Sequence, residues 1–367
     1  MPEKKISIHD LARQLNVSSA TVSFVLNGKA SEKRISRAVE NKILKYAQKS
    51  GYRPNRVAKS LRTGKSRIIG MLVEGISDPF FSSIARIVEE QIHQYDYKIF
   101  YASTNNDPAI AKELIKAYRD TQVDGYIIAP PPGIEEDVKS LLEDGFPVVL
   151  FDRYFPELTT HNIVANNFDG AYQAVLHFVQ NGYKRIGIVT LDSAQIQMEE
   201  RLSGYFRAME ENGLKPLVRK IPYGRNPDSI IEGVKSFLDK KHRPEAILFA
   251  TNYLAVSGLK VIADLRCRIP EDIAVIGFDD NSHFSLFSPS ITAVAQPVED
   301  ISRTVVERLM TCLAEGDKPP PMGTTMFPTR LIVRESSAKA VKSPNPPKEA
   351  KAPQQKTQQS ITINTAI

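Results

Sequence analysis

The sequence predicts an α/β protein in which a small all-helical domain precedes a larger body of doubly wound parallel sheets. Three observations lead to this fold class. Apolar residues recur at helical spacing up to residue 51, and from residue 68 short apolar runs alternate with helical stretches. The charge changes at the same point, since residues 1–67 hold 16 basic and 4 acidic side chains, whereas residues 68–335 hold 27 and 37.

The composition excludes several classes of protein. With 367 residues, 42% of them hydrophobic and 25% charged, the chain can form two or three globular domains. It has no apolar run near the roughly 18 to 20 residues of a membrane span, and its start lacks the apolar segment of a secretory signal. Cys267 and Cys312 stand in no metal-ligand spacing and fit a reducing compartment. We therefore expect a cytoplasmic protein.

The first two helices are short and joined by a tight turn. Ser18 can cap the second helix, and the buried faces of the two helices consist of Ile8, Leu11, Ala12, Leu15, Val22, Val25 and Leu26. The outward positions 19, 20, 21 and 23 carry small residues, and Asn27-Gly28 provides the left-handed turn that ends the second helix. This pattern predicts a helix-turn-helix, whose second helix lies close to base edges and phosphates in the major groove of DNA.

A third helix and a short basic segment follow. Ser36 can cap a helix that stops at Gly51, with Val39, Ile43, Leu44 and Ala47 on its inner face. Asn55 can then cap a helix that runs through Leu61. Because helices shorter than about 12 residues are marginal in water, this one needs a partner. DNA is one such partner, with Leu61 wedged into a minor-groove step. The alternative is that Leu61 belongs to the core of the next domain.

The body alternates continuous apolar strands with helices, as in parallel sheets covered on both faces. Ligands of such sheets bind beyond the carboxyl ends of the strands. The loops expected there carry aromatic rings, carboxylates, an amide and guanidinium groups, on Phe80, Asp152, Arg153, Arg201, Asn252, Tyr253 and Asp279. This set suits a neutral polyhydroxylated ligand such as a sugar or nucleoside, because each hydroxyl needs a donor and an acceptor. The alternative is that the aromatic residues are core and the charged ones are solvated.

Two stretches give the chain a specific resemblance. "ISIHDLARQLNVSSATVSFVLNG" followed by "GYRPNRVAKSLRTGKSRIIG" resembles the DNA-binding headpiece and hinge of the lactose-repressor (LacI/GalR) family of bacterial transcription regulators. The resemblance continues through "ERLSGYFRAM" and "IPEDIAVIGFDD" to about residue 335. It implies a periplasmic-binding-protein-like core of two similar lobes, one of about 67–164 and 296–330 and the other of about 165–295.

The resemblance also implies roles for individual residues. Those implied to contact DNA are Ser7, Ser19, Ala20, Thr21, Ser23, Phe24, Asn27, Asn55, Ala58 and Leu61. Positions 19, 20 and 24 would face bases, and positions 7, 21, 23 and 27 would lie toward the backbone. Leu61 from each subunit of a homodimer would open the centre of a near-palindromic operator. The residues implied to bind the effector are Asp152, Arg201, Asn252 and Asp279.

Four departures from the family pattern concern binding or specificity. Phe24 stands where most members have an arginine, and a phenylalanine cannot donate hydrogen bonds to guanine as arginine does. The stretch "NGKASEKRIS" is about three residues longer than the common form, and Glu40 stands where a basic phosphate contact is often found. The loop cations Lys29, Lys33 and Arg34 can compensate for that contact. Tyr253 replaces a common acidic residue, and a stacking tyrosine mildly favours a sugar.

The expected protein is a ligand-responsive, sequence-specific DNA-binding regulator, with repression as the expected mode. Its expected parts are a helix-turn-helix domain (1–53), a hinge (54–66), an effector-binding and dimerisation core (67–335) and a disordered tail (336–367). We expect a sugar effector; a purine or nucleoside effector, or no small-molecule control, are the alternatives. The sequence contains no dinucleotide-binding glycine motif, phosphate-binding loop or metal spacing of histidines, so we expect no cofactor, metal or catalysis.

Overall fold

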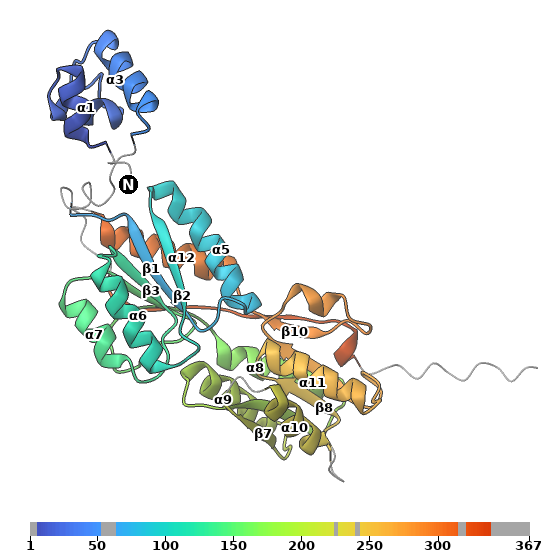
Figure 1. Ribbon diagram of the computed structural model, residues 1–367. Helices are drawn as coiled ribbons and strands as arrows, with labels where there is room; N and C mark the ends of the chain where they lie inside the picture. The colour runs from blue at the N-terminus through green and yellow to red at the C-terminus, as the bar shows by residue number, and fades with distance from the viewer. Residues whose placement is uncertain (1–5, 53–63, 224–226, 239–242, 315–320, 339–367) are drawn as a thin grey trace, which may run out of the picture. The chain divides into compact units, whose positions relative to one another are not determined.

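The computed structural model describes residues 6–52, 64–223, 227–238, 243–314 and 321–338 (Figure 1). Two compact units make up the chain, one of Met1–Asp169, Ser193–Glu200 and Gln296–Arg330 and the other of Gly170–Asp192, Arg201–Ala295 and Leu331–Ile367. We call residues 6–52 the headpiece, the other described residues of the first unit the first lobe, and those of the second unit the second lobe. The expected hinge helix lies outside the described residues.

The headpiece contains three helices, α1 (Ile8–Leu15), α2 (Ser19–Leu26) and α3 (Arg37–Lys49). Each begins after a serine whose hydroxyl accepts a hydrogen bond from a backbone N–H of the first turn. Their buried side chains form one core of Leu11, Ala12, Leu15, Val22, Val25, Ala30, Ile43 and Ala47. The prediction that Leu44 shares this core was wrong. Leu44 lies about 100° around the helix from Ile43 and is 44% exposed.

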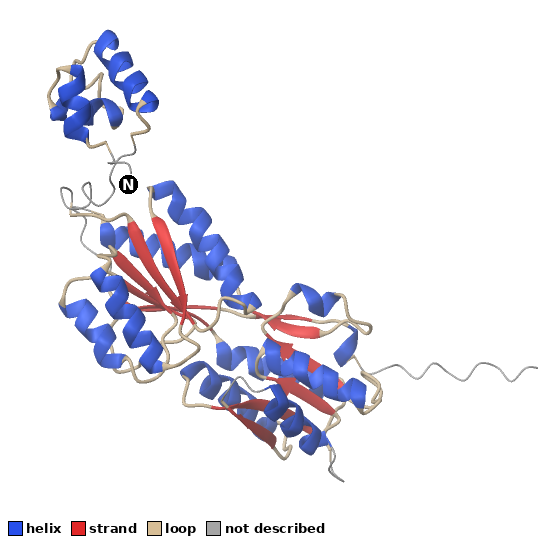
Figure 2. Cartoon of the chain, in the orientation of Figure 1, coloured by secondary structure: helices blue, strands red, loops and turns tan. Residues whose placement is uncertain are grey.

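The first lobe contains a six-stranded sheet in the order β11-β5-β4-β3-β1-β2. Its strands are β1 (Ile68–Val73), β2 (Lys98–Ser103), β3 (Gly125–Ile128), β4 (Val148–Phe151), β5 (His161–Ala165) and β11 (Gly323–Phe327), and every neighbouring pair is parallel. The helical elements are α5 (Pro79–Ile92), the 3-10 turn η1 (His93–Tyr95), α6 (Pro108–Asp120), α7 (Glu135–Glu143) and α12 (Val298–Leu313). Figure 2 shows the strands lying between helices.

Two apolar clusters bury the two faces of this sheet. On one face, α5 and α12 pack with side chains such as Met71 and Phe151, and on the other α6 and α7 pack with Leu72 and Leu150. Successive residues of a strand point to opposite faces, so a strand covered on both sides must be apolar throughout. This requirement explains the unbroken apolar runs in the sequence.

The second lobe repeats this topology in a sheet of order β12-β10-β9-β8-β6-β7. Its strands are β6 (Ile186–Asp192), β7 (Leu217–Pro222), β8 (Ala246–Phe249), β9 (Ala274–Phe278), β10 (Thr292–Ala295) and β12 (Arg330–Ile332). Its helical elements are α8 (Asn167–Gln180), α9 (Ile196–Glu211), α10 (Pro227–Leu238), α11 (Asn252–Asp264), η2 (Ser282–Ser285) and η3 (Glu335–Ser337), although α8 up to Asp169 and α9 up to Glu200 belong to the first unit. The predicted α/β fold class is confirmed. In the described part of the chain, no helix is long and apolar enough to cross a membrane.

The described chain ends inside the second lobe. Ser336 Oγ donates to the Val275 carbonyl oxygen at 2.7 Å and accepts from the Thr292 N–H at 2.8 Å. Ser337 Oγ lies 2.8 Å from Nε2 of His177, and both serines are fully buried. The prediction that disorder begins at residue 336 was wrong for 336–338, because these hydroxyls satisfy buried polar groups. The rest of the expected tail, 339–367, lies outside the described residues.

We predict that Ser336→Ala lowers the free energy of unfolding by about 1–3 kcal/mol, because the buried Thr292 N–H and Val275 carbonyl lose this partner. Urea denaturation of the full chain measures the change. Ser282→Ala is the control, since Ser282 is exposed. Equal stability of the two variants would show that the C-terminal serines do not anchor the lobe.

Candidate functional site

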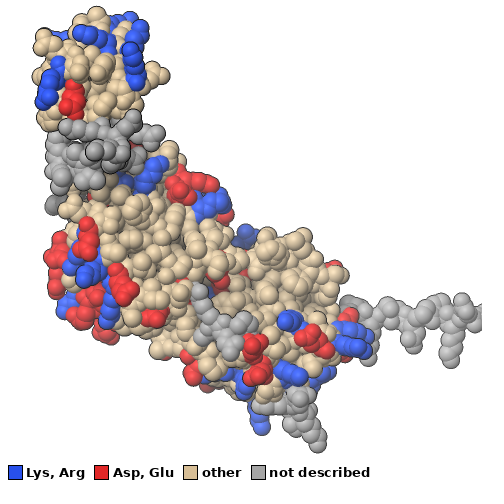
Figure 3. All heavy atoms as spheres, in the orientation of Figure 1, with Lys and Arg blue, Asp and Glu red and all other residues tan. Residues whose placement is uncertain are grey.

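Helix α2 presents small side chains on a basic headpiece. Ala20 is exposed, and Ser19, Thr21 and Ser23 are half-buried. Figure 3 shows several lysine and arginine side chains, and fewer acidic ones, on the visible headpiece surface. Among the residues of α2 that are predicted to contact DNA, Phe24 alone has a large side chain. It is half-buried and is not part of the headpiece core. Small side chains let a helix backbone approach closely, so α2 has the form of a helix that enters a DNA groove.

Hydrogen bonds within the headpiece orient several of the predicted DNA contacts. The pairs are Ser7 Oγ with the Asp10 carboxylate (2.7 Å), Ser18 Oγ with Thr21 Oγ1 (2.8 Å) and Asn27 Nδ2 with the Ser23 carbonyl oxygen (2.7 Å). These bonds lie at the ends of α1 and α2, so helix capping sets the position of each group. The predicted contacts that lie outside the described residues are Asn55, Ala58 and Leu61.

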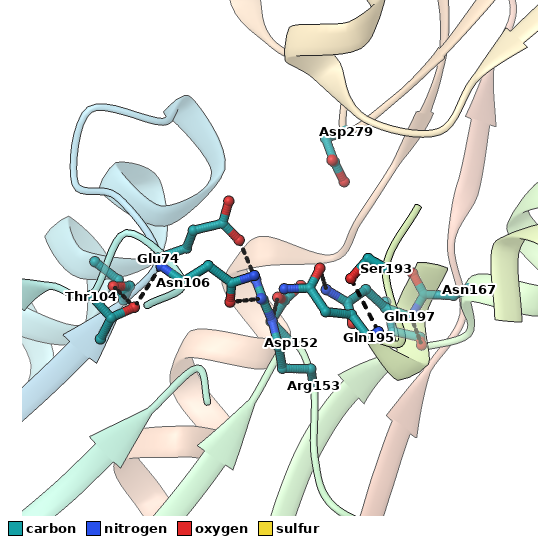
Figure 4. Close-up of polar contacts among 12 residues, drawn as sticks. Glu74, Thr104, Asn106, Asp152, Arg153, Asn167, Ser193, Gln195, Gln197 and Asp279 are labelled. Atoms are coloured by element: carbon teal, nitrogen blue, oxygen red, sulfur yellow. Dashed lines mark hydrogen bonds and ion pairs between the residues drawn. The ribbon is translucent and has the colours of Figure 1, made fainter. Parts of the chain in front are cut away.

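In the first lobe, Arg153 is held by side chains from the carboxyl ends of three strands (Figure 4). The guanidinium donates to Asp152 after β4 at 2.9 Å and to Asn106 in the loop after β2 at 3.0 Å. It also donates to Glu74 after β1 at 2.7 Å. We call these four residues the first-lobe cluster. Arg153 is only 4% exposed, so two carboxylates neutralise a buried cation.

The first-lobe cluster has an arginine with a raised pKa and an aspartate with an unusual backbone conformation. Burial alone would lower the pKa of Arg153, but the charges and hydrogen bonds of Asp152 and Glu74 raise it above its ordinary value. The guanidinium carbon also lies 5.9 Å from the Phe81 ring centroid. Asp152 has a φ of 66°, in the left-handed region that side-chain-bearing residues seldom adopt. Backbone strain of this kind is concentrated at functional sites.

The second lobe holds a similar cluster around Arg201 of α9. Arg201 Nη1 donates to the Ala250 carbonyl oxygen at 2.6 Å, and both terminal nitrogens lie 3.5 Å from an oxygen of Asp279. The guanidinium carbon lies 3.7 Å from the centroid of the Phe278 ring. We call these four residues the second-lobe cluster. Arg201 is 2% exposed, so its charge is also buried beside a carboxylate.

The two clusters occupy equivalent places in their sheets. Asp152 follows β4 and Asp279 follows β9, and each of these strands is third in the order of its sheet. Both aspartates have a φ of 66°. The arginine is the next residue in one lobe and comes from a helix in the other. Each lobe therefore places a strained aspartate and a buried arginine at the carboxyl end of the same strand of the fold.

Three other predicted residues lie near strand ends. Asn252 is buried in the first turn of α11, where the Thr251 hydroxyl accepts from the Leu254 N–H at 3.3 Å, and Tyr253 beside it is half-buried. Arg201 binds the Ala250 carbonyl just before this turn, so the start of α11 adjoins the second-lobe cluster. Phe80 differs, because it packs in the first-lobe core.

Sequence reasoning missed Glu74, Asn106, Gln195 and Gln197. The two glutamines are buried, and Gln197 Nε2 donates to Gln195 Oε1 at 3.4 Å. Gln195 Nε2 and Gln197 Oε1 have no hydrogen-bond partner among the described residues. A buried amide without a partner costs free energy, so a ligand that pairs with it gains binding free energy. The strand-end rule points to the loops that hold these four residues, but composition does not tell which side chain in a loop turns inward.

The described residues contain no group of three histidine, cysteine, aspartate or glutamate side chains that could hold a metal ion. Cys267 and Cys312 are free thiols. Both clusters instead combine carboxylate and guanidinium groups, and the first-lobe cluster adds the Asn106 amide. These are groups that recognise a polar ligand by hydrogen bonds.

Known proteins share both parts of this architecture. Residues 7–55 match the family model for bacterial regulatory proteins of the lacI family, and residues 175–337 match that for a periplasmic binding protein-like domain. The chain is 32% identical over 309 residues to catabolite control protein A of Priestia megaterium, covering 83% of this chain and 92% of that protein. It is 30% identical over 307 residues to the HTH-type transcriptional repressor PurR of Photobacterium profundum, covering 83% and 91%.

A solved structure extends the similarity to three dimensions. The lac repressor dimer bound to operator and the anti-inducer ONPF aligns with a TM-score of 0.80 over 91% of this chain and 99% of that chain, at 22% identity. This alignment shows a common fold. The match to the binding-protein model extends to residue 337, which agrees with the burial of Ser337.

We predict that Arg153→Met lowers the free energy of unfolding by about 3–5 kcal/mol, because it removes the buried cation that pairs with Asp152 and Glu74. Urea denaturation is the measurement. Arg86→Met is the control, because its pair with Glu90 on α5 is exposed and should contribute under about 1 kcal/mol. A loss as small as that of the control would contradict the buried-pair account of this cluster.

Proposed function

Because this chain belongs to the lacI family of bacterial regulatory proteins and is a DNA-binding transcription regulator with a ligand-binding core, we propose that it is a repressor whose effector is a sugar. The single observation that carries the effector class is the pair of arginine–aspartate clusters at equivalent strand ends. In this proposal the headpiece supplies the DNA contacts and the core supplies the effector site.

The DNA-reading surface that we propose is the exposed side of α2. An exposed alanine and three half-buried hydroxyl side chains leave its backbone accessible. The segment 1–67, with 16 basic and 4 acidic residues, supplies the attraction to phosphates. The proposed contacts are Ser7, Ser19, Ala20, Thr21, Ser23, Phe24, Asn27, Asn55, Ala58 and Leu61. Two headpieces of a homodimer would read a near-palindromic operator in the cytoplasm.

We predict that Ala20→Asp lowers affinity for the operator at least about hundredfold, because it places a negative charge against the phosphates. The matched control is Ala38→Asp. Ala20 and Ala38 are both exposed and both second in their helices, so the two changes have the same local effect on helix stability. Electrophoretic mobility shift with the operator measures both. Equal losses in the two variants would place the DNA surface elsewhere.

The chemistry of the core favours a ligand with many hydroxyls. The first-lobe cluster offers carboxylate and guanidinium groups, and Gln195 and Gln197 add one amide donor and one amide acceptor without partners among the described residues. Each sugar hydroxyl can donate to a carboxylate or amide oxygen and accept from an N–H group. The proposed effector-binding residues are Asp152, Arg153, Arg201, Asn252, Tyr253 and Asp279, without the predicted Phe80, which packs in the first-lobe core.

The aromatic rings support a sugar over a purine or nucleoside. A purine base is bound best between open aromatic faces. The Phe278 ring, however, is covered by the Arg201 guanidinium at 3.7 Å, and Phe80 makes an edge contact with Phe81 at 5.1 Å between centroids. Tyr253 is half-buried and can stack on a sugar ring. Two of these rings are therefore covered, whereas the polar groups of both clusters suit a ligand with many hydroxyls.

We predict that one sugar from a panel of mono- and disaccharides, sugar acids, nucleosides and purine bases stabilises the full chain. A ligand at about 100 times its Kd adds about 2.7 kcal/mol, which is visible as a rise in Tm. Arg201→Lys should abolish the rise, because lysine cannot bind the Ala250 carbonyl and Asp279 together. Arg207→Lys, an exposed change on the same helix, should keep it.

The outcomes separate the alternatives. A rise with a purine or nucleoside alone would replace the sugar by that class. No rise with any compound, in a chain that still binds operator, would contradict control by a sugar. A rise that survives Arg201→Lys would move the effector site away from the second-lobe cluster.

A further inference from the structure

Phe24 lies outside the headpiece core and is paired with a lysine. The core cluster and the half-buried residues packed on it include Val22, Val25 and Leu26 of α2, but not Phe24. Lys33 Nζ lies 5.3 Å from the centroid of the Phe24 ring, within cation–π range. An exposed ammonium is thus held beside the one large aromatic side chain of α2.

The loop between α2 and α3 holds Lys33 in this place. Lys29 N–H donates to the Phe24 carbonyl at 2.8 Å, and Lys33 N–H donates to the Lys29 carbonyl at 3.1 Å. Ile35 N–H closes the turn on the Ala30 carbonyl at 2.9 Å, and Ala30 is buried in the headpiece core. The loop is therefore a closed turn tied to the core, which limits the positions that the Lys33 side chain can reach.

The two side chains complement each other chemically. A phenyl ring can contact the methyl group of thymine, but it has no donor for the acceptors N7 and O6 of guanine. Lysine can donate to both acceptors. Successive bases on a strand lie about 3.4 Å apart, so an ammonium 5.3 Å from the ring centroid reaches a base pair one or two steps away.

We propose that Phe24 and Lys33 read DNA as one unit, in which the ring contacts a thymine methyl and the ammonium donates to a guanine one or two base pairs along. The proposal rests on the proposed function, in which α2 enters the major groove. A ring at the base edges keeps the neighbouring ammonium at the base edges too, which favours a base contact for Lys33 over a phosphate contact.

The test is selection of bound sequences from a pool of randomised duplex DNA by the full chain. The wild type should enrich a site with a T·A pair one or two steps from a G·C pair in each half. Lys33→Met, which keeps the length of the side chain and removes its charge, should reduce the preference for that G·C pair about tenfold and leave other positions unchanged. Lys29→Met, in the same loop, is the matched control. Loss of a phosphate contact there would lower affinity for all sequences alike, so this variant should change no base preference.

A double-mutant cycle tests the coupling. Phe24→Ala should remove the preference for T·A and weaken the preference for G·C, because Lys33 loses its platform. Adding Lys33→Met to Phe24→Ala should then reduce the G·C preference much less than it does in the wild type. Because Phe24 is outside the core, unfolding curves should show that the variants remain folded.

Two results would overturn the proposal. If Lys33→Met weakens binding equally to all sequences and lowers the salt dependence by about one phosphate contact, Lys33 binds the backbone. If Lys33→Met changes nothing, Lys33 does not contact DNA. Failure of the proposed function is a different result, in which the wild-type chain enriches no sequence at all.

Discussion

A buried arginine paired with an aspartate at the carboxyl end of a core strand is the interaction on which the polar cluster of each lobe depends. Removing two charges from water is costly, and apolar residues of similar size would often give equal or greater stability. Arg153 and Arg201 are nevertheless almost fully buried beside Asp152 and Asp279. Fold stability alone does not require such pairs, whereas recognition of a polar ligand does require charged groups held in fixed positions.

The repeated topology explains why these groups recur. In a parallel sheet all strands end at one edge, and side chains that follow the strands gather there. The first lobe uses this edge to bring residues after β1, β2 and β4 to one guanidinium. The second lobe combines the residue after β9 with an arginine from α9. The same scaffold thus carries two different arrangements of the same groups.

The sequence predicted the elements better than the contacts. Helical spacing in residues 8–51 indicated the helices, because burial of one helix face requires apolar residues at a regular period. Apolar runs after residue 68 indicated the strands, because a strand buried on both faces is apolar throughout. Leu44 was wrongly assigned to the core because it is apolar and adjoins Ile43, which is the residue that the helical period of α3 places in the core. Glu74, Gln195 and the Phe24–Lys33 contact could not be predicted, since they depend on which loop side chains turn toward each other. Ser336 was assigned to a tail because a buried serine and a solvated serine look alike in composition.

The exclusion of Phe24 from the headpiece core has a consequence for gene duplication and divergence. Residues 22, 25 and 26 of the same helix are fixed by packing, so their replacement costs stability. Phe24, and the exposed side chains of the adjoining loop such as Lys33, are free of that constraint. A duplicated copy of the gene can therefore acquire a new set of target promoters by single substitutions there, without passing through an unfolded intermediate protein.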